Sequence, residues 1–397
     1  MKSFNEAGIP LILVHCLEQM GFITPTPIQA QTIPVALQGN DILGSAQTGT
    51  GKTAAFGIPL VTHLINSIQG NSLVLLPTRE LALQVMQTLK QFTGKSKIST
   101  ALLIGGEDIR RQCHKLKAKP RLIVGTPGRI NDHLIRKTLQ LGNTDFLVLD
   151  EVDRMLDMGF SMQLDIINKH LTAKRQTLMF SATMPNNIQK LSTKYLRKPV
   201  RISMGSTHIP TENIKQEHAK LSDLEKYPRL LKEFDYRTGS IIVFIKTKHA
   251  AETMAKKLRK LGYRANALHG DLRQNKRTQV IENFRKQNYR ILIATDVAAR
   301  GLDIPHIQHV INYDLPQRPE DYIHRIGRTA RAGSTGEAIS FLSPSENMKW
   351  KAIQRLLNPS AKINGLDRYR KGKNNHKTVK NHKCKPRNRQ RKKHSAA

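Results

Sequence analysis

The fold of this chain is decided by residues 46–53, which are Ala46-Gln47-Thr48-Gly49-Thr50-Gly51-Lys52-Thr53. An apolar run precedes this stretch at residues 42–43, and a segment of helical period follows it from residue 54. The order strand, glycine-rich loop, helix lets backbone N–H groups and the helix N-terminus surround phosphate oxygens. Lys52 can then reach the β- and γ-phosphates of a nucleotide, and the Thr53 hydroxyl can bind Mg²⁺. The strict pattern has glycine at position 46, so an ordinary glycine-rich turn is the alternative to a nucleoside-triphosphate loop.

Short apolar runs separated by helical patterns occur in two series. The first series lies at residues 73–76, 100–104, 122–124, 146–149 and 177–180, and the second at 241–245, 265–268, 291–294, 310–312 and 338–342. Such alternation predicts parallel sheets covered by helices on both faces. Residues 203–213 lack periodicity and contain Gly and Pro, so we place a linker there. The sequence therefore predicts an α/β protein in which one architecture occurs twice.

Three carboxylates follow the apolar run at residues 146–149, namely Asp150, Glu151 and Asp153. Ligands of parallel sheets bind at the carboxyl ends of the strands, so these acids are expected near the phosphate loop. They would repel one another without a cation, and Mg²⁺ suits a site that also binds phosphate. Asp150 would hold the metal through water, and Glu151 would orient and deprotonate the attacking water. An acidic turn that opens a helix is the alternative.

Two further patterns fit a nucleotide site. Gln29 follows a Pro-Thr-Pro turn, and a glutamine amide matches the N6/N7 edge of adenine; a surface glutamine is the alternative. Arg325, Arg328 and Arg331 recur every third residue, a spacing that on a helix would align them along one side for phosphate contact. An arginine delivered across a cleft can raise phosphoryl-transfer rates by ~10³ to 10⁵, whereas a solvated helix face is the alternative.

Composition restricts the partners of the chain. Lysine and arginine number 65 against 30 acids, a formal net charge of +35 that favours phosphate polyanions as partners. Residues 361–397 hold 14 of the basic residues and one acid, so we expect a disordered basic tail, with a solubilising role as the alternative. The three cysteines, Cys16, Cys113 and Cys384, form no C-x-x-C pair and favour neither a disulfide framework nor a zinc site. No apolar run reaches the ~18 residues of a membrane span, so we expect a cytoplasmic protein without membrane contact.

With these motifs in this order and spacing, residues 3–345 closely resemble the DEAD-box ATP-dependent RNA helicases, particularly the short bacterial kind with a basic C-terminal extension. The resemblance implies two RecA-like lobes that close on ATP and RNA together. It gives an N-terminal RecA-like ATP-binding domain at 1–205, a linker at 206–212 and a C-terminal RecA-like domain at 213–345. A terminal helix at 346–360 and a disordered basic RNA-binding tail at 361–397 follow.

The resemblance also assigns roles to individual residues. It implies that Phe4 stacks on adenine, that Gln29 contacts the adenine edge, and that Asp303 holds the ribose. The phosphate loop corresponds to Ala46–Thr53, with Thr53 and Asp150 at the metal and Lys52, Glu151, Arg328 and Arg331 as catalytic residues. The RNA backbone would meet Arg79, Gly106, Thr126, Gly128, Arg129, Lys248, Gln274, Arg277, Thr295 and Arg300. Coupling of hydrolysis to strand separation would involve Asp153, Ser181, Thr183, His324 and Arg325.

One residue departs from the family pattern, because Val152 stands where the family has Ala. Every carboxylate is kept, and β-branching is tolerated near a strand end, so we expect an effect on coupling rates at most.

The expected function is ATP hydrolysis coupled to gripping single-stranded RNA and separating short duplexes, with ATP and Mg²⁺ as cofactors and a monomer as the oligomeric state. A DNA-directed translocase of the same superfamily and an RNA chaperone or clamp acting through the tail are the alternatives. Ribosomal RNA and RNA-decay assemblies are candidate partners by resemblance, since phosphate contacts carry no base information.

Overall fold

The structure is a computed structural model that describes residues 1, 3–46, 49–94, 96–203, 213–299, 304, 306–330 and 335–358. The predicted linker at 206–212 and the predicted tail at 361–397 lie outside these residues. Residues 1–359 form one compact unit. None of the helices in the described part of the chain has the length and apolar character that a membrane span requires.

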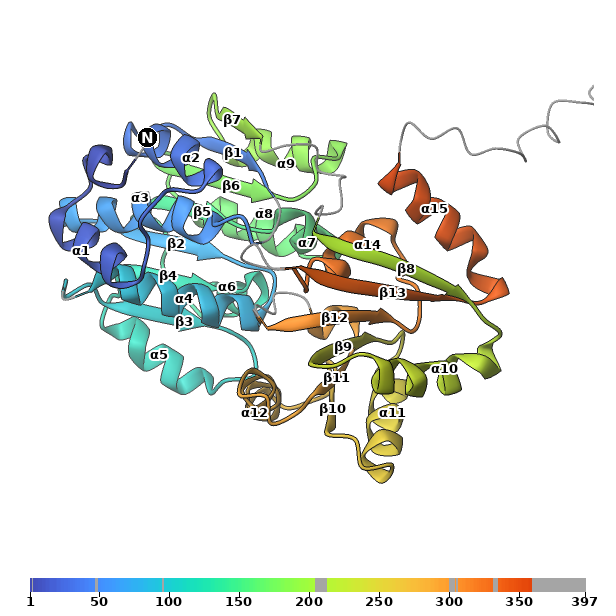
Figure 1. The fold of residues 1–397 in the computed structure, drawn as a ribbon. Coiled ribbons are helices and arrows are strands. Elements are labelled where there is room, and N and C mark those ends of the chain that lie inside the picture. The colour runs from blue at the N-terminus through green and yellow to red at the C-terminus, as the bar shows by residue number, and fades with distance from the viewer. Residues whose placement is uncertain are drawn as a thin grey trace, which may run out of the picture. The chain divides into compact units, whose positions relative to one another are not determined.

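The N-terminal half forms a parallel seven-stranded sheet in the order β3-β4-β2-β5-β6-β1-β7 (Figure 1). Its strands are β1 (Ile42–Ser45), β2 (Asn71–Leu75), β3 (Thr100–Leu103), β4 (Leu122–Gly125), β5 (Thr144–Leu149), β6 (Gln176–Ser181) and β7 (Val200–Ser203). The helices are α1 (Leu11–Gln19), α2 (Pro27–Leu37), α3 (Lys52–Asn66), α4 (Arg79–Thr93), α5 (Ile109–Lys117), α6 (Pro127–Ile135), α7 (Val152–Asp157), α8 (Ser161–His170) and α9 (Asn186–Tyr195), after the short 3-10 helix η1 (Asn5–Ala7).

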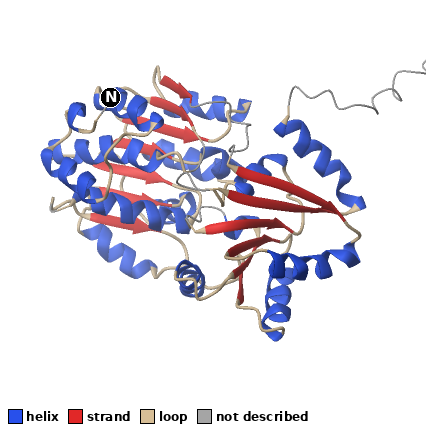
Figure 2. Ribbon diagram, viewed as in Figure 1, coloured by secondary structure: helices blue, strands red, loops and turns tan. Residues whose placement is uncertain are grey.

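The C-terminal half forms a parallel six-stranded sheet in the order β10-β11-β9-β12-β13-β8 (Figure 2). Its strands are β8 (Ile214–Lys220), β9 (Ser240–Phe244), β10 (Ala265–Leu268), β11 (Ile291–Ala294), β12 (Ile307–Asn312) and β13 (Gly336–Leu342). The helices are α10 (Asp223–Tyr236), α11 (Lys248–Lys260), α12 (Gln274–Arg285), α13 (Asp296–Ala299), α14 (Pro319–Ile326) and α15 (Asn347–Leu357), with the 3-10 helix η2 (Pro344–Glu346) before the last. Both sheets confirm the predicted α/β fold with two parallel sheets.

Each sheet is buried on both faces, because successive side chains of a strand point to opposite sides. In β5, Phe146 and Val148 belong to one apolar cluster, whereas Leu147 and Leu149 belong to the other. The second sheet follows the same rule in β9, where Ile242 and Phe244 pack apart from Ile241 and Val243. Continuous apolar runs are therefore the signal of these strands, as expected for parallel sheets.

Two strands and one helix differ from the sequence prediction. β7 and β8 were not predicted, since both have several exposed positions and lack a continuous apolar run. The arginine row is also wrong as predicted: α14 ends at Ile326, so it carries Arg325 but not Arg328. Gly327 follows as the C-cap, which ends the helix before the second arginine. Arg331 lies outside the described residues.

Candidate nucleotide and RNA sites

The glycine-rich loop joins the carboxyl end of β1 to the first turn of α3, as predicted. Gly49 and Gly51 have φ values of +89° and +92°, in the left-handed region that favours glycine. A Cβ atom at Gly51 would lie 2.5 Å from the Gln29 Nε2 atom, so glycine also gives the close approach between loop and glutamine. Gln47 and Thr48 lie outside the described residues. The loop thus has the backbone conformation that the phosphate-binding interpretation requires at its described end.

Lys52 is 5% exposed and connects the loop to the acidic cluster. Its Nζ atom donates to the Ala46 carbonyl oxygen at 3.0 Å and lies 3.7 Å from the Asp150 Oδ1 atom. Thr53 is half-buried in the first turn of the same helix. A cationic side chain and a hydroxyl therefore stand at the helix N-terminus, where an anion is stabilised.

The acidic cluster follows β5, and each carboxylate has its own surroundings. Burial raises the pKa of Asp150 to about 6, because the pull of Lys52 is smaller than the loss of solvation, and Glu151 and Asp153 raise the pKa further. Glu151 has φ +52° and its Oε2 atom lies 3.2 Å from Arg154 Nη1. A buried carboxyl with a raised pKa is one that a nearby divalent cation would keep ionised.

The donor set fits Mg²⁺ bound largely through phosphate and water. Asp150 and Thr53 offer oxygen ligands, which Mg²⁺ prefers, and it commonly uses one or two carboxylates with substrate phosphates. The described residues contain no group of three or more His, Cys, Asp or Glu side chains that could hold a metal alone. The protein ligands present would therefore form a metal site only together with a nucleotide.

Asp153 connects the acidic cluster to the end of β6. Its Oδ2 atom accepts hydrogen bonds from the Ala182 and Thr183 N–H groups at 3.1 and 3.0 Å and from the Thr183 hydroxyl at 3.2 Å. The Ser181 hydroxyl in turn donates to the Thr183 carbonyl oxygen at 2.7 Å. The candidate coupling residues of this lobe thus form one hydrogen-bonded group.

Gln29 lies in the first turn of α2 and is 2% exposed. Its Oε1 atom accepts from the Thr26 N–H at 2.9 Å, and its Nε2 atom donates to the Gly51 carbonyl oxygen at 3.1 Å. An amide has two N–H donors and two lone pairs on its oxygen, so these contacts leave one of each for a ligand. Phe4 is 4% exposed and packs edge-on against Phe22; its contact with adenine stays a prediction.

The described second-lobe motifs centre on Arg325, which is 2% exposed. Its guanidinium donates to both Asp296 carboxylate oxygens at 2.5 and 2.7 Å and to the Asn312 side chain at 3.1 Å. This arginine is therefore fully used in holding α14 to the end of β11. Arg328 is 3% exposed and its Nε atom donates to the His324 carbonyl oxygen at 3.0 Å. Arg300 and Asp303 lie outside the described residues.

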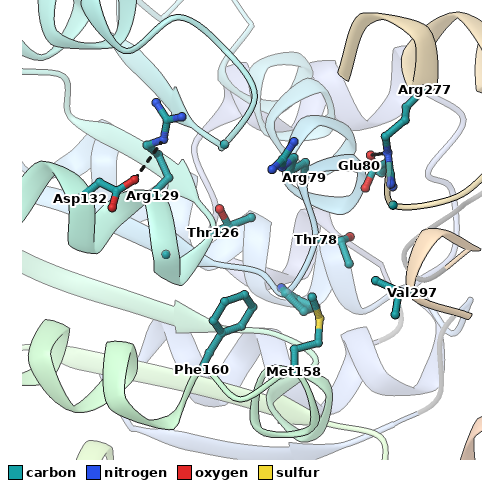
Figure 3. A pocket seen from close by; sticks show the side chains of 14 residues that line it. Thr78, Arg79, Glu80, Thr126, Arg129, Asp132, Met158, Phe160, Arg277 and Val297 are labelled. Carbon is teal, nitrogen blue, oxygen red and sulfur yellow. Dashed lines mark hydrogen bonds and ion pairs between the residues drawn. The ribbon is translucent and has the colours of Figure 1, made fainter. Parts of the chain in front are cut away.

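A pocket of about 400 Å³ collects most of the predicted RNA contacts of the first lobe (Figure 3). Five predicted residues line it: Arg79, Thr126, Gly128, Arg129 and Arg277. Gly106 lies beside it, since a Cβ atom there would be 2.4 Å from Arg79 Nη1. The wall carries three arginines against two carboxylates, Glu80 and Asp132. The lining is suited to a polyanion.

Residues of α4 and α12 meet at this pocket. Arg79 Nη1 donates to Gln274 Oε1 at 3.2 Å, and Arg277 Nε donates to Glu80 Oε1 at 2.9 Å. Thr295 is 9% exposed and its backbone N–H donates to the Leu268 carbonyl oxygen at 3.2 Å. Lys248 lies apart from the pocket-lining residues and pairs with Asp271 at 2.7 Å while remaining exposed.

Sequence reasoning missed several polar residues that support these sites. Arg154 contacts Glu151 from three residues along the chain, a spacing that brings helical side chains together and was available as a signal. Glu80 pairs with a residue 197 positions away, and Gln112 with His133 over 21 positions. No local pattern announces such contacts.

Comparisons with known proteins identify the family. Residues 26–191 match the DEAD/DEAH box helicase family, and residues 222–333 match the helicase conserved C-terminal domain. The DEAD-box ATP-dependent RNA helicase CshA of Geobacillus kaustophilus is 44% identical over 357 residues, which cover 89% of this chain and 76% of the relative. The chain belongs to the DEAD-box ATP-dependent RNA helicases.

Solved structures agree with this membership. Dbp5 of S. cerevisiae, bound to RNA and ADP BeF3, matches the helicase with a TM-score of 0.82 and 32% identity, over 90% of this chain and 94% of that one. Mss116p bound to ssRNA and AMP-PNP gives a TM-score of 0.81 and 30% identity, over 90% and 76%. The two sheets of the helicase are therefore RecA-like, and the chain is an ATP-binding, RNA-dependent enzyme.

Proposed function

We propose that this helicase hydrolyses ATP at the loop formed by β1 and α3 while its pocket between α4 and α6 grips the backbone of single-stranded RNA. The observation that carries the proposal is the position of Lys52, which lies between the loop carbonyl of Ala46 and the carboxylate of Asp150. That lysine would bind the phosphates of the nucleotide. Two solved relatives hold RNA together with an ATP analogue, which supports simultaneous binding here.

The chemical roles follow from charge and position. Glu151 takes a proton from the attacking water, and Arg328 and Arg331 neutralise charge that develops on the γ-phosphate. Thr53 and Asp150 hold Mg²⁺, which offsets the negative charge of the phosphate oxygens when bound. Phe4 and Gln29 select adenine, and Asp303 binds the ribose. Phosphoryl transfer depends on positioning and charge compensation, both of which these residues supply.

The RNA contacts are proposed from the same reasoning. The pocket-lining arginines and the residues of α11, α12 and the turns beside them bind phosphates and sugars, which gives grip without sequence preference. Separation of short duplexes follows when the two RecA-like domains bind ATP and one RNA strand together. Coupling passes through Asp153, which ties the acidic cluster to Ser181 and Thr183, and through His324 and Arg325.

We also propose the domain limits from the sequence, with lobes at 1–205 and 213–345, a linker at 206–212, a terminal helix at 346–360 and an RNA-binding tail at 361–397. A monomer in the cytoplasm, acting on ribosomal RNA or with RNA-decay assemblies, is the proposed setting.

The test is an ATPase assay with and without single-stranded RNA, followed by unwinding of duplexes whose loading strand is RNA or DNA. RNA-stimulated hydrolysis and unwinding only from RNA loading strands are expected. Equal unwinding from DNA would favour the DNA-directed alternative. Hydrolysis that RNA does not stimulate, with strand annealing retained, would favour a chaperone acting through the tail.

A further inference from the structure

A buried hydrogen-bond network stands behind Arg129, on the side of α6 away from the pocket opening. Its centre is Gln112 of α5, which is 2% exposed. The Gln112 Nε2 atom donates to the Ile104 carbonyl oxygen at 2.9 Å and lies 3.3 Å from a Glu107 carboxylate oxygen. Its Oε1 atom accepts from Arg129 Nη1 at 3.3 Å. One amide thus joins the end of β3, the turn after it and the pocket arginine.

His133 completes the network from α6 and is fully buried. Its Nε2 atom lies 3.1 Å from Gln112 Oε1, and its Nδ1 atom lies 2.8 Å from the Thr138 hydroxyl oxygen. Because the Gln112 NH₂ group faces the Ile104 carbonyl, the amide oxygen must face His133, so Nε2 carries the proton and Nδ1 accepts from Thr138. Burial, followed by the charge of Arg129, lowers the pKa of His133 and favours this neutral form.

The other contacts of Arg129 are weaker than the one to Gln112. Both terminal nitrogens reach the Glu107 carbonyl oxygen only at 3.4 Å, and Nε lies 3.7 Å from Asp132, whose side chain is 56% exposed (Figure 3). Hydrogen bonds of this length are near the limit of useful geometry, and exposed ion pairs stabilise little. The buried amide of Gln112 is therefore the fixed point against which the guanidinium is oriented.

We propose that Gln112 and His133 are positioning residues for RNA binding, which hold the Arg129 guanidinium and the Gly105–Gly106 turn in the geometry that accepts an RNA phosphate. His133 acts through Gln112, since its N–H fixes the amide oxygen toward the arginine. The inference rests on the proposed function, in which Arg129 and Gly106 contact RNA. A pre-oriented arginine loses less conformational entropy on binding, so the network raises affinity without touching RNA.

The first experiment replaces His133 with Phe, which keeps a ring of similar size and removes both nitrogens. RNA affinity is measured by fluorescence anisotropy of a labelled single-stranded oligouridylate, and the ATPase rate is titrated with the same RNA. We expect the half-saturating RNA concentration to rise by about 5- to 10-fold, roughly the effect of one lost orienting hydrogen bond, with kcat at saturating RNA and KM for ATP within about twofold of wild type. His133→Gln, which keeps an N–H donor, should restore most of the affinity.

A matched control is His114→Phe, the same substitution at an exposed position of α5. It should leave the RNA half-saturation unchanged. Thermal melting and circular dichroism check that His133→Phe folds. Gln112→Glu provides a second route, because it keeps the shape and the acceptor but places a carboxylate beside Arg129. That change should also weaken RNA binding, since the guanidinium would pair with the carboxylate rather than with phosphate.

A double-mutant cycle with Arg129→Ala decides between positioning and independent effects. If His133 acts through Arg129, the double variant binds RNA about as weakly as Arg129→Ala alone. Losses that multiply, or wild-type affinity for both His133→Phe and Gln112→Glu, would overturn the inference while leaving the proposed function intact. Wild-type affinity for Arg129→Ala would overturn both the RNA-binding assignment of that arginine and the inference.

Discussion

Replacing Gln29 with Ala separates two roles that the structure gives to one amide. In the nucleotide-free protein the side chain caps α2 through Thr26 and supports the phosphate loop through the Gly51 carbonyl oxygen. One N–H and one lone pair remain on the amide, which is the pair that adenine's N6/N7 edge requires. The substitution removes the support and the base contact together, yet only the base contact distinguishes ATP from GTP.

The size of each effect follows from the contacts. Removing a buried side chain with two hydrogen bonds leaves the Thr26 N–H and the Gly51 carbonyl without these partners, a loss of about 1 to 3 kcal/mol in the free energy of unfolding. The base contact is of similar size, so ATP affinity should fall by about 10- to 100-fold. GTP lacks the matching edge, and its already weak affinity should change little. The ratio of the two affinities should therefore collapse toward one.

The assay is competition of ATP and GTP against a fluorescent nucleotide, combined with thermal melting without nucleotide. Gln29→Glu is the companion variant, since its carboxylate still accepts from the Thr26 N–H but cannot donate to the Gly51 carbonyl or to adenine. It should keep more of the stability than Gln29→Ala and lose the ATP preference just as fully. Equal fold-losses for ATP and GTP in both variants would show that the glutamine only supports the loop.

Four other predictions concern chemistry, grip and stability. Glu151→Gln should retain ATP binding and lower RNA-stimulated turnover by ~10² or more; turnover within a few-fold of wild type would refute its role as base. Arg328→Ala should reduce the ATPase rate far more than nucleotide-free RNA binding, and the reverse pattern would assign the side chain to RNA. Deleting residues 361–397 should leave turnover at saturating RNA nearly unchanged, weaken RNA affinity most on duplexes with long flanks, and flatten the salt dependence by ~0.7 per lost phosphate contact; unchanged values would mean a solubilising tail. Because burial lowers the pKa of His133, the native state binds fewer protons than the unfolded state below about pH 6.5, so stability should fall as the pH drops through that range. His133→Gln should show a shallower fall in acid-range melts, and identical profiles would contradict the buried neutral histidine.

The sequence by itself determined the elements whose signals are local. The phosphate loop is announced by consecutive residues, and buried parallel strands such as β5 need apolar side chains on both faces, so their positions were predicted within a few residues. The same holds for the acidic motif, because the carboxyl end of a strand is where such a sheet exposes polar groups. The family resemblance then placed the remaining candidates residue by residue.

Tertiary structure alone decided which distant residues meet. Strand order brings β1 between β6 and β7, and no pattern along the chain specifies that arrangement. The exposed strands β7 and β8 are strands because neighbours offer them backbone partners, since their own sequences carry little apolar signal. Gly327 ends α14 and separates Arg328 from Arg325, although their spacing suits one helix. The contact of Gln112 with His133 likewise depends on α5 packing near α6, because side-chain hydrogen bonds form wherever the fold brings donor and acceptor together, at any separation in sequence.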